Sequence, residues 1–303
     1  MRRSTGRLRS TTLGLSLFLW CMDGPADAFA QVSSLSNSAT RRDFFVVAHQ
    51  DDWQLFMGDI VVQALKTGTP VTFIYLTAGD DGRDSSYWQT RERAALASTR
   101  VATGIPATAS DSQGCQFVAV LAHPIRKCAV GLTDSYFLRL PDGRRNGAGF
   151  KRYDNQSMRR LRLKKVGTLT TVDRSNKYES WDDLARTVSS LIDTASVARI
   201  VVHTMDPSIA VNPHDHFDHR LAGLLASDLR KRRSLDVRYY VGYALSTRAA
   251  NRSNAQAQRK TSVFMAYDKE MMRSNPAWSA YREHPAFYSG CMLRTYARSP
   301  RSR

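Results

Sequence analysis

An apolar run that ends abruptly in polar side chains is the feature that most constrains the fold of this chain. Residues 44–48 read Phe-Phe-Val-Val-Ala, and they are followed by His49, Gln50, Asp51 and Asp52. A short run rich in aromatic and β-branched residues predicts a buried strand. Ligands of open α/β sheets bind at the carboxyl ends of the strands. The sequence therefore predicts that a histidine and two carboxylates meet at such an edge, an arrangement that suits a metal site.

A second polar cluster follows another apolar run far downstream. Residues 198–204 contain Ile-Val-Val-His-Thr, and residues 214–219 read His-Asp-His-Phe-Asp-His. A hydrolytic zinc site needs about three protein ligands and an open position for water, and histidine and aspartate suffice. Taken alone, each cluster is also explained as a polar loop or a helix cap. Together they favour one metal site built from two strand ends, with a neighbouring carboxylate available as general base.

The order of the expected elements favours an α/β layered domain, because strands and helices alternate along the chain. Asp52 is positioned to cap the first helix and Gly68 to end it, and Ser180 begins a later helix. Residues 115–150 contain short strands and turns, which predict an excursion from the sheet. A loose basic tail is expected at residues 294–303. Other helices and strands are expected at residues 53–66, 70–76, 87–103, 199–203, 217–232, 237–244 and 263–272.

The first thirty residues have the pattern of a secretory leader. Four arginines precede the apolar segment 13–22, and residues 28–30 read Ala-Phe-Ala, an A-x-A cleavage pattern that places the mature N-terminus at Gln31. The apolar segment is too short to span a membrane, so we expect an exported protein, periplasmic or extracellular after cleavage. A membrane-anchored N-terminus is the alternative. Residues 31–303 are then expected to form a single domain.

Removal of residues 1–30 leaves three cysteines, Cys115, Cys128 and Cys291. Disulfides persist outside the cytoplasm. Cys115 and Cys128 flank a predicted turn and could close a hairpin-like loop, which would stabilise the fold by about 3 kcal/mol in the chain-entropy model. Two free thiols are the alternative. Because the chain has no C-x-x-C pair, we do not expect cysteine to bind zinc.

The chain is strongly basic. Its formal net charge is +17, and because residues 1–30 hold four arginines and two aspartates, the expected mature chain carries +15. Basic residues concentrate at 144–165 and 230–233. In an exported protein this balance predicts contact with anionic glycans, glycolipids or a membrane surface rather than with nucleic acid. A solvated basic surface that only maintains solubility is the alternative.

Three short motifs resemble, in order along the chain, the three motifs of the LmbE-like or PIG-L family of zinc-dependent N-acetylglucosaminyl deacetylases. They are Ala-His-Gln-Asp-Asp at 48–52, Thr-Ala-Gly-Asp-Asp-Gly at 77–82 and His-Phe-Asp-His at 216–219. The resemblance spans most of the expected mature chain. It implies an α/β fold, a Rossmann-like three-layer sandwich with a mostly parallel sheet. It also implies bound Zn²⁺, or another divalent metal, and an N-acetylated aminosugar substrate.

The resemblance also implies roles for residues of the first and third motifs. His49, Asp52 and His219 would bind the metal, and Asp51 would be the general base. His214 is an alternative third ligand. The other two residues of the third motif would act on the reaction: His216 would stabilise the oxyanion or protonate the leaving amine, and Asp218 would orient His216.

Substrate contacts are expected from the second motif and the helix that follows it. Arg91 resembles the substrate-contacting arginine of the family. The glycine-bearing loop after the strand at 70–76 emerges at the same sheet edge as His49, so its charged residues either help select the substrate or are simply solvated. These loop residues are Asp80, Asp81 and Arg83.

Three positions depart from the family pattern. Gln50 stands where proline is usual and Trp53 where glutamate is usual, but neither position binds the metal. Ala94 replaces the acidic residue that usually follows the helix arginine by three positions, which weakens the assignment of Arg91. The remaining histidines are expected to be structural or surface residues: His123, His203 and His284.

The function expected from these features is zinc-dependent hydrolysis of an N-acetyl group on a glucosamine-containing glycan, glycolipid or aminosugar conjugate. The main alternative is an exported, non-catalytic protein that binds polyanions or glycans on the same fold. A phosphoesterase is a third possibility, but its sites often bridge two metals and need more ligands than the two clusters clearly offer.

Overall fold

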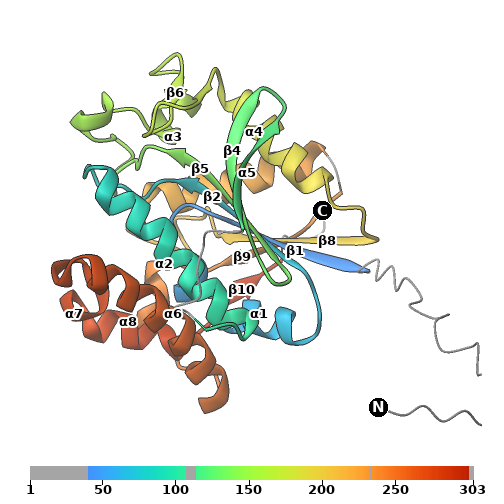
Figure 1. Ribbon diagram of the computed structural model, residues 1–303, viewed down its shortest axis with the longest axis vertical. Helices are drawn as coiled ribbons and strands as arrows, with labels where there is room; N and C mark the ends of the chain where they lie inside the picture. The colour runs from blue at the N-terminus through green and yellow to red at the C-terminus, as the bar shows by residue number, and fades with distance from the viewer. Residues whose placement is uncertain (1–39, 107–113, 233, 300–303) are drawn as a thin grey trace, which may run out of the picture. The chain divides into compact units, whose positions relative to one another are not determined.

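The central strand of the fold is β1, Arg41–Val47, and both of its faces are buried. Phe44 and Val46 belong to one hydrophobic core, and Phe45 and Val47 belong to a second. A strand that is covered on both faces needs apolar side chains at successive positions, which explains the continuous apolar run. The computed structural model describes residues 40–106, 114–232 and 234–299 (Figure 1).

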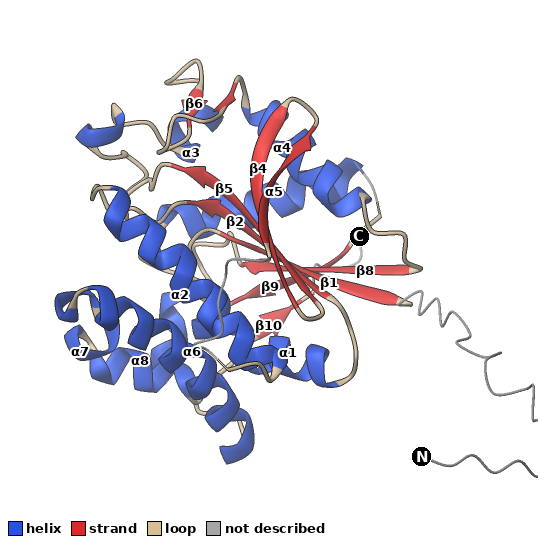
Figure 2. Ribbon diagram, viewed as in Figure 1, coloured by secondary structure: helices blue, strands red, loops and turns tan. Residues whose placement is uncertain are grey.

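Within these residues, eight strands form one sheet in the order β10-β9-β8-β1-β2-β5-β4-β3. The five strands from β9 to β5 are parallel, and the outer pairs at both edges are antiparallel (Figure 2). The strands after β1 are β2 Val71–Thr77, β3 Cys115–Val120, β4 His123–Val130, β5 Thr133–Leu140, β8 Arg199–Met205, β9 Asp236–Tyr240 and β10 Ala297–Arg298. A separate two-stranded ribbon consists of β6 Leu169–Thr170 and β7 Lys177–Tyr178.

Helices cover both faces of the sheet, with α1, α2 and α6 on one side and α4 and α5 on the other (Figure 1). This arrangement is the predicted three-layer α/β sandwich with a mostly parallel sheet. No helix among the described residues is long and apolar enough to cross a bilayer. The α-helices are α1 Asp52–Lys66, α2 Ser85–Thr103, α3 Met158–Arg162, α4 Trp181–Asp193, α5 Phe217–Arg232, α6 Asn254–Ser274, α7 Ala280–Glu283 and α8 Pro285–Met292. The 3₁₀ helices are η1 Lys151–Tyr153, η2 Tyr243–Thr247 and η3 Pro276–Trp278.

The β-rich segment predicted at 115–150 extends the sheet rather than leaving it. β5 pairs with β2 in parallel, and β4 and β3 continue outward as an antiparallel hairpin. Cys115 and Cys128 are directly paired across β3 and β4 and form a disulfide. The predicted hairpin loop is therefore closed covalently, and Cys291 is buried as a free thiol.

The expected cap of the first helix is wrong. Asp52 does not cap α1, because its Oδ2 accepts hydrogen bonds from the backbone N–H groups of Ala48 (3.0 Å) and His49 (2.9 Å). Asp51 occupies the N-cap position, but its side chain accepts no capping hydrogen bond from the helix. Neither carboxylate at the end of β1 therefore caps α1 through its side chain.

The C-terminal region is more ordered than predicted. The helix expected at 263–272 is part of the longer α6, which Ser253 caps. The strand expected at 237–244 ends at Tyr240, because the chain then turns into η2. Residues 294–299 are not loose: β10 pairs with β9, and Arg298 forms an ion pair with buried Asp206, with Nη2 2.8 Å from Oδ1. The leader prediction at 1–30 and the tail at 300–303 lie outside the described residues.

The disulfide between β3 and β4 should stabilise the folded protein. We expect the Cys115→Ser and Cys128→Ser double variant to lose about 3 kcal/mol of unfolding free energy, because the cross-link restricts the unfolded chain. Urea denaturation of both proteins measures this difference. A reducing agent should destabilise the natural chain and leave the double variant unchanged; equal stability of the two proteins would contradict the prediction.

Candidate metal centre

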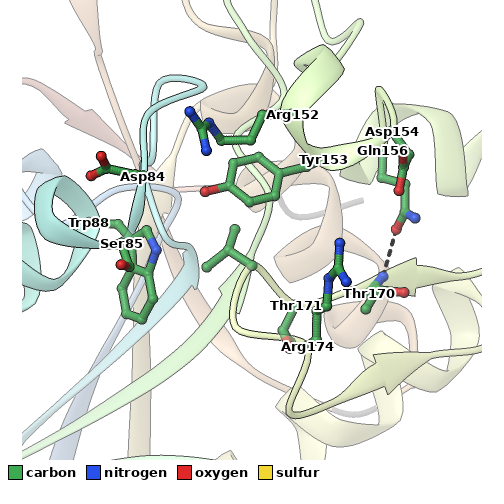
Figure 3. A pocket seen from close by; sticks show the side chains of 11 residues that line it. Asp84, Ser85, Trp88, Arg152, Tyr153, Asp154, Gln156, Thr170, Thr171 and Arg174 are labelled. Carbon is green, nitrogen blue, oxygen red and sulfur yellow. Dashed lines mark hydrogen bonds between the residues drawn. The ribbon is translucent and has the colours of Figure 1, made fainter.

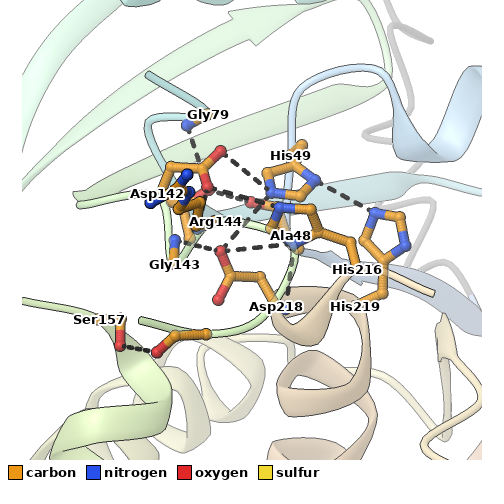
Figure 4. A network of polar contacts seen from close by, with 12 residues as sticks. Ala48, His49, Gly79, Asp142, Gly143, Arg144, Ser157, His216, Asp218 and His219 are labelled. Carbon is orange, nitrogen blue, oxygen red and sulfur yellow. Dashed lines mark hydrogen bonds and ion pairs between the residues drawn. The ribbon is translucent and has the colours of Figure 1, made fainter. Parts of the chain in front are cut away.

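Three loops bring polar side chains together at the carboxyl edge of the parallel strands. The first connects β1 to α1 and carries His49 and Asp52, and the second connects β8 to α5 and carries His216. The third follows β5 and carries Asp142, which was not assigned from the sequence. Figure 4 shows that His49, Asp142 and His216 converge with residues of the first turn of α5. The predicted meeting of two strand ends is therefore observed, with a third strand end added.

Two imidazoles and one carboxylate form a compact group in this cluster. His49 Nδ1 lies 3.1 Å from His219 Nε2, and Asp52 Oδ1 lies 3.0 Å from His219 Nε2 and 3.5 Å from His49 Nδ1. The three residues are 5%, 2% and 1% exposed for His49, Asp52 and His219. Two nitrogens and one carboxylate oxygen at such separations are a ligand set that suits a divalent cation such as Zn²⁺.

The outward nitrogens of both histidines face carboxylates. His219 Nδ1 lies 2.9 Å from Asp215 Oδ1. His49 Nε2 lies 3.6 Å from Asp142 Oδ2 and 3.7 Å from Asp218 Oδ2, and it has no hydrogen-bond partner among the described residues. A metal-binding histidine commonly donates its other N–H to a carboxylate, which fixes the ring and strengthens the ligand. Asp215 and Asp142 take this supporting position here.

His49 also belongs to a second group of potential ligands, which contains Asp142, His216 and Asp218. A neutral imidazole has one free nitrogen, so His49 can bind a single cation and donate through its other nitrogen. Coordination through Nδ1 leaves the Nε2 proton directed at two buried carboxylates. The group with Asp52 and His219 therefore satisfies both ring nitrogens.

The buried carboxylates of the cluster favour positive charge on its histidines. Burial alone would lower the pKa of His49, but Asp52, Asp218 and Asp142 raise it to about 10. Burial likewise opposes protonation of His219, yet Asp52 and Asp215 raise its pKa well above the usual value. Burial would raise the pKa of Asp52, but the two histidines hold it well below its usual range. A divalent cation would supply the charge that protons on the histidines otherwise provide.

Asp51 is not part of this ligand group, but it lines the same cavity as His49 and Asp52. Its Oδ1 forms an ion pair with Nη2 of Arg91, a buried arginine whose Nη1 donates to the carbonyl oxygen of Gly79 at 3.1 Å. Arg91 was predicted to contact the substrate. It lines the cavity, but its guanidinium is engaged by the candidate base. Its first role in this structure is to hold the Asp51 carboxylate in place.

His216 is oriented differently from the prediction. Its Nδ1 accepts from the backbone N–H of Asp218 at 3.2 Å, whereas its Nε2 lies 3.5 Å from Asp142 Oδ1. The Asp218 carboxylate is 3.8 Å from His216 Nδ1 and accepts instead from the N–H of Gly143 at 2.7 Å. Asp142, rather than the Asp218 side chain, is the carboxylate that faces the outer nitrogen of His216. Asp142 lies in a Pro-Asp-Gly turn at residues 141–143, and this common turn sequence did not indicate that it would face His216.

The charged residues of the loop after β2 separate into two kinds. Asp80 is buried, and its carboxylate accepts from the N–H groups of Gly82 (2.9 Å) and Asp142 (2.7 Å). Burial and the Asp142 charge raise the pKa of Asp80 to about 7. Asp80 therefore supports the loop and does not reach the cavity, contrary to its expected substrate contact. Asp81 and Arg83 are exposed, line the cavity and lie 3.4 Å apart.

The cavity beside His49, Asp52 and His219, called the metal group below, has a volume of about 280 Å³. His49, Asp51, Asp52 and His216 line it. The rest of the lining comes mainly from α1, α2 and the C-terminal helices, and it includes Leu55, Tyr87, Tyr243, Tyr267, Met271, Trp278, Glu283 and Tyr288. The aromatic residues of this lining were not predicted, because no motif marks them.

A larger cavity of about 450 Å³ lies beside η1 and the β6–β7 ribbon. Figure 3 shows Trp88, Tyr153 and Arg152 at its edge, and it contains neither group of potential metal ligands. The remaining histidines also lie outside both groups. His214 is exposed and belongs to neither group, so its prediction as an alternative third ligand is wrong. His123 and His203 are buried and form hydrogen bonds with Asn176 and Tyr240. His284 lies at the surface.

The chain matches the model of the family described as PIG-L, GlcNAc-PI de-N-acetylase, over residues 44–229. This match covers more than half of the chain and contains the three candidate metal ligands of the metal group, His49, Asp52 and His219. The chain belongs to the PIG-L family. No curated protein matches the chain significantly in sequence.

The solved structures that match this chain do so at low sequence identity. An N,N′-diacetylchitobiose deacetylase from Pyrococcus horikoshii is 13% identical, with a TM-score of 0.48, and the match covers 86% of this chain and 82% of that one. A deacetylase of the teicoplanin biosynthetic pathway is 14% identical, with a TM-score of 0.45 and coverage of 82% and 88%. The 4-carboxy-2-hydroxymuconate hydratase GalB from Pseudomonas putida is 13% identical, with a TM-score of 0.41 and coverage of 82% of each chain.

The PIG-L match ends before the C-terminal walls of the cavity. Residues 230–299 contribute Tyr243, Tyr267, Trp278 and Tyr288 to the lining, although the family model stops at residue 229. The candidate ligands thus lie within the matched range, whereas much of the cavity lining comes from a segment outside it.

The carboxylate behind His219 should matter for metal affinity. We expect Asp215→Asn to weaken zinc binding by about 10- to 100-fold, because the amide cannot accept the His219 Nδ1 proton as a carboxylate does. Competition with a fluorescent zinc chelator measures this change. Asp182→Asn is the matched control, since that carboxylate pairs with Arg232 at the surface. Unaltered affinity in Asp215→Asn would show that Asp215 does not support the ligand.

Proposed function

We propose that this PIG-L protein is a zinc-dependent deacetylase that removes an N-acetyl group from a glucosamine-containing glycan, glycolipid or aminosugar conjugate. One observation carries the proposal: a buried ligand group of two histidines and one aspartate shares a cavity with the carboxylate of Asp51. Such a site offers the two parts that metal-assisted hydrolysis requires, a set of ligands for a cation and a base.

His49, Asp52 and His219 would hold the cation through Nδ1, Oδ1 and Nε2. When bound, Zn²⁺ or another divalent metal lowers the pKa of water and polarises the acetyl carbonyl. Three protein ligands, rather than four, are the usual set of catalytic rather than structural zinc sites.

The residues of the chain itself then manage the protons. Asp51 accepts a proton from the attacking water, and Arg91 keeps the Asp51 carboxylate directed into the cavity. His216 Nδ1 accepts from the backbone N–H of Asp218, so its Nε2–H, which lies 3.5 Å from Asp142 Oδ1, is the group that would donate to the oxyanion formed from the acetyl carbonyl. Cleavage of the carbon–nitrogen bond gives acetate and a free amine, and the amine takes up a proton from Asp51 or His216.

We further propose that the protein acts outside the cytoplasm. The Cys115–Cys128 disulfide supports this location, because disulfides persist mainly in oxidising compartments. The secretory pattern of residues 1–30 supports it as well. The non-catalytic alternative differs in one measurable respect, since a polyanion-binding protein needs neither the metal nor the Asp51 carboxylate.

Removal of the base should separate metal binding from turnover. We expect Asp51→Asn to retain zinc and to lose about 10²- to 10⁴-fold in kcat, because an amide cannot accept the proton of water. The measurements are zinc content by mass spectrometry and acetate release from a panel of N-acetylglucosamine glycans. His219→Ala is the complementary variant, and it should lose zinc as well as activity.

Two results would contradict this proposal. Near-normal turnover in Asp51→Asn would refute the assignment of the base. A zinc-loaded natural chain that releases no acetate from any glycan of the panel would refute deacetylation and leave the metal site intact. Asp182→Asn, which changes an exposed carboxylate outside the cavity, is the matched control for an effect of charge alone.

A further inference from the structure

The cavity wall formed by η3 and α2 presents an aromatic corner beside the metal group. Trp278 is the last residue of η3, and Tyr87 lies in the first turn of α2. Their ring centroids are 5.1 Å apart, and the rings are nearly perpendicular at 86°. Both line the cavity that His49 and Asp51 also line, and both are only partly buried. Two fixed aromatic rings therefore face a space that continues to the candidate base.

The position of this corner relative to Asp51 follows from a chain of contacts. Arg91 pairs with Asp51, and its guanidinium carbon lies 6.0 Å from the Tyr87 ring centroid. Trp278 makes a T-shaped contact with Tyr87. Contacts therefore connect Asp51 through Arg91 and Tyr87 to Trp278, which is partly exposed. The aromatic corner belongs to the outer part of the site.

The segment that carries Trp278 is held rigidly. Asn275 caps η3 by accepting from the N–H of Ala277 at 2.9 Å. Ser279, which directly follows Trp278, donates to buried Asp268 of α6 at 2.7 Å. The same carboxylate accepts from the N–H of Tyr281 at 3.2 Å. A preorganised aromatic ring loses little conformational freedom when it binds a ligand.

The cavity lining offers no unpaired arginine to an anionic ligand. Five carboxylates and two arginines line it. Arg91 is engaged by Asp51, and Arg83 pairs with Asp81 and covers the Tyr87 ring, 4.4 Å from its centroid. A bound divalent cation would bring the lining only close to neutrality. An uncharged ligand therefore fits this lining better than a phosphorylated or carboxylated one.

The volume of the cavity limits what can lie inside it. About 280 Å³ is at the lower end of ligand cavities, which hold roughly 300–1,000 Å³. One N-acetylated sugar ring over the metal group would occupy most of this space. A second ring attached to it would then lie against the outer aromatic corner.

We propose that Trp278, held in a T-shaped contact with Tyr87, forms a subsite for an uncharged pyranose ring joined to the N-acetylated sugar, so that the substrate is a neutral oligosaccharide of at least two rings. The apolar face of a pyranose packs against aromatic rings, and its hydroxyls can reach the nearby carboxylates Asp81 and Glu283. This subsite rests on the proposed deacetylase function. Because Trp278 lies beyond residue 229, the selectivity comes from a segment outside the PIG-L match.

Chain-length kinetics test the subsite. Acetate release from N-acetylglucosamine, N,N′-diacetylchitobiose and N,N′,N″-triacetylchitotriose gives kcat/KM for one, two and three rings. We expect a rise of about tenfold from one ring to two, and little further rise with a third ring. Trp278→Ala should bring the two-ring to one-ring ratio close to one, whereas the matched variant Trp278→Phe, which retains an aromatic face, should keep most of it. An unchanged ratio in Trp278→Ala would overturn the proposal.

A binding measurement separates this proposal from the proposed function. Calorimetric titration of zinc-loaded Asp51→Asn with the one-ring and two-ring sugars does not require turnover. Tighter binding of the two-ring sugar, lost in the additional Trp278→Ala variant, supports the subsite even if no sugar releases acetate. Equal affinities for both sugars overturn the subsite even if deacetylation is observed. Preferential binding of N-acetylglucosamine 1-phosphate would overturn the assignment to an uncharged ligand.

Discussion

The carboxylate of Asp52 is the interaction on which the arrangement of the site depends. One of its oxygens accepts the backbone N–H groups of Ala48 and His49, and the other lies 3.0 Å from His219. It therefore connects the end of β1, the start of α1 and the first turn of α5. A buried carboxylate is costly unless it is fully paired, and here both oxygens are occupied. Asp142 adds a second link between these segments, because it lies 3.6 Å from His49 and 3.5 Å from His216.

The sequence predicts those parts of the site whose structure is determined by a single segment of the chain. The apolar run before His49 specified a strand buried on both faces, and α5 begins and ends at the predicted residues, 217 and 232. Polar residues that directly follow such a strand must lie at its carboxyl edge. That local rule was sufficient to bring His49 and the cluster at 214–219 together.

The parts that the sequence did not predict depend on contacts between distant segments. Asp142 follows β5 in an ordinary turn sequence, and only the pairing of β5 with β2 brings it beside His49 and His216. Asp52 was expected to cap a helix, because its bonds to the preceding backbone are invisible in a linear pattern. Trp278 enters the cavity only because α6 packs along α2, as Figure 1 shows. These errors share one cause, which is tertiary packing over long sequence separations.

Anomalous diffraction from zinc-loaded crystals would test the central claim most directly, since it locates the metal without reference to activity. The arrangement of His49, Asp52 and His219 predicts one strong zinc peak at about 2.0–2.2 Å from His49 Nδ1, Asp52 Oδ1 and His219 Nε2. A peak bound instead by Asp142, His216 and Asp218, or no zinc peak at this edge of the sheet, would contradict the proposed metal centre.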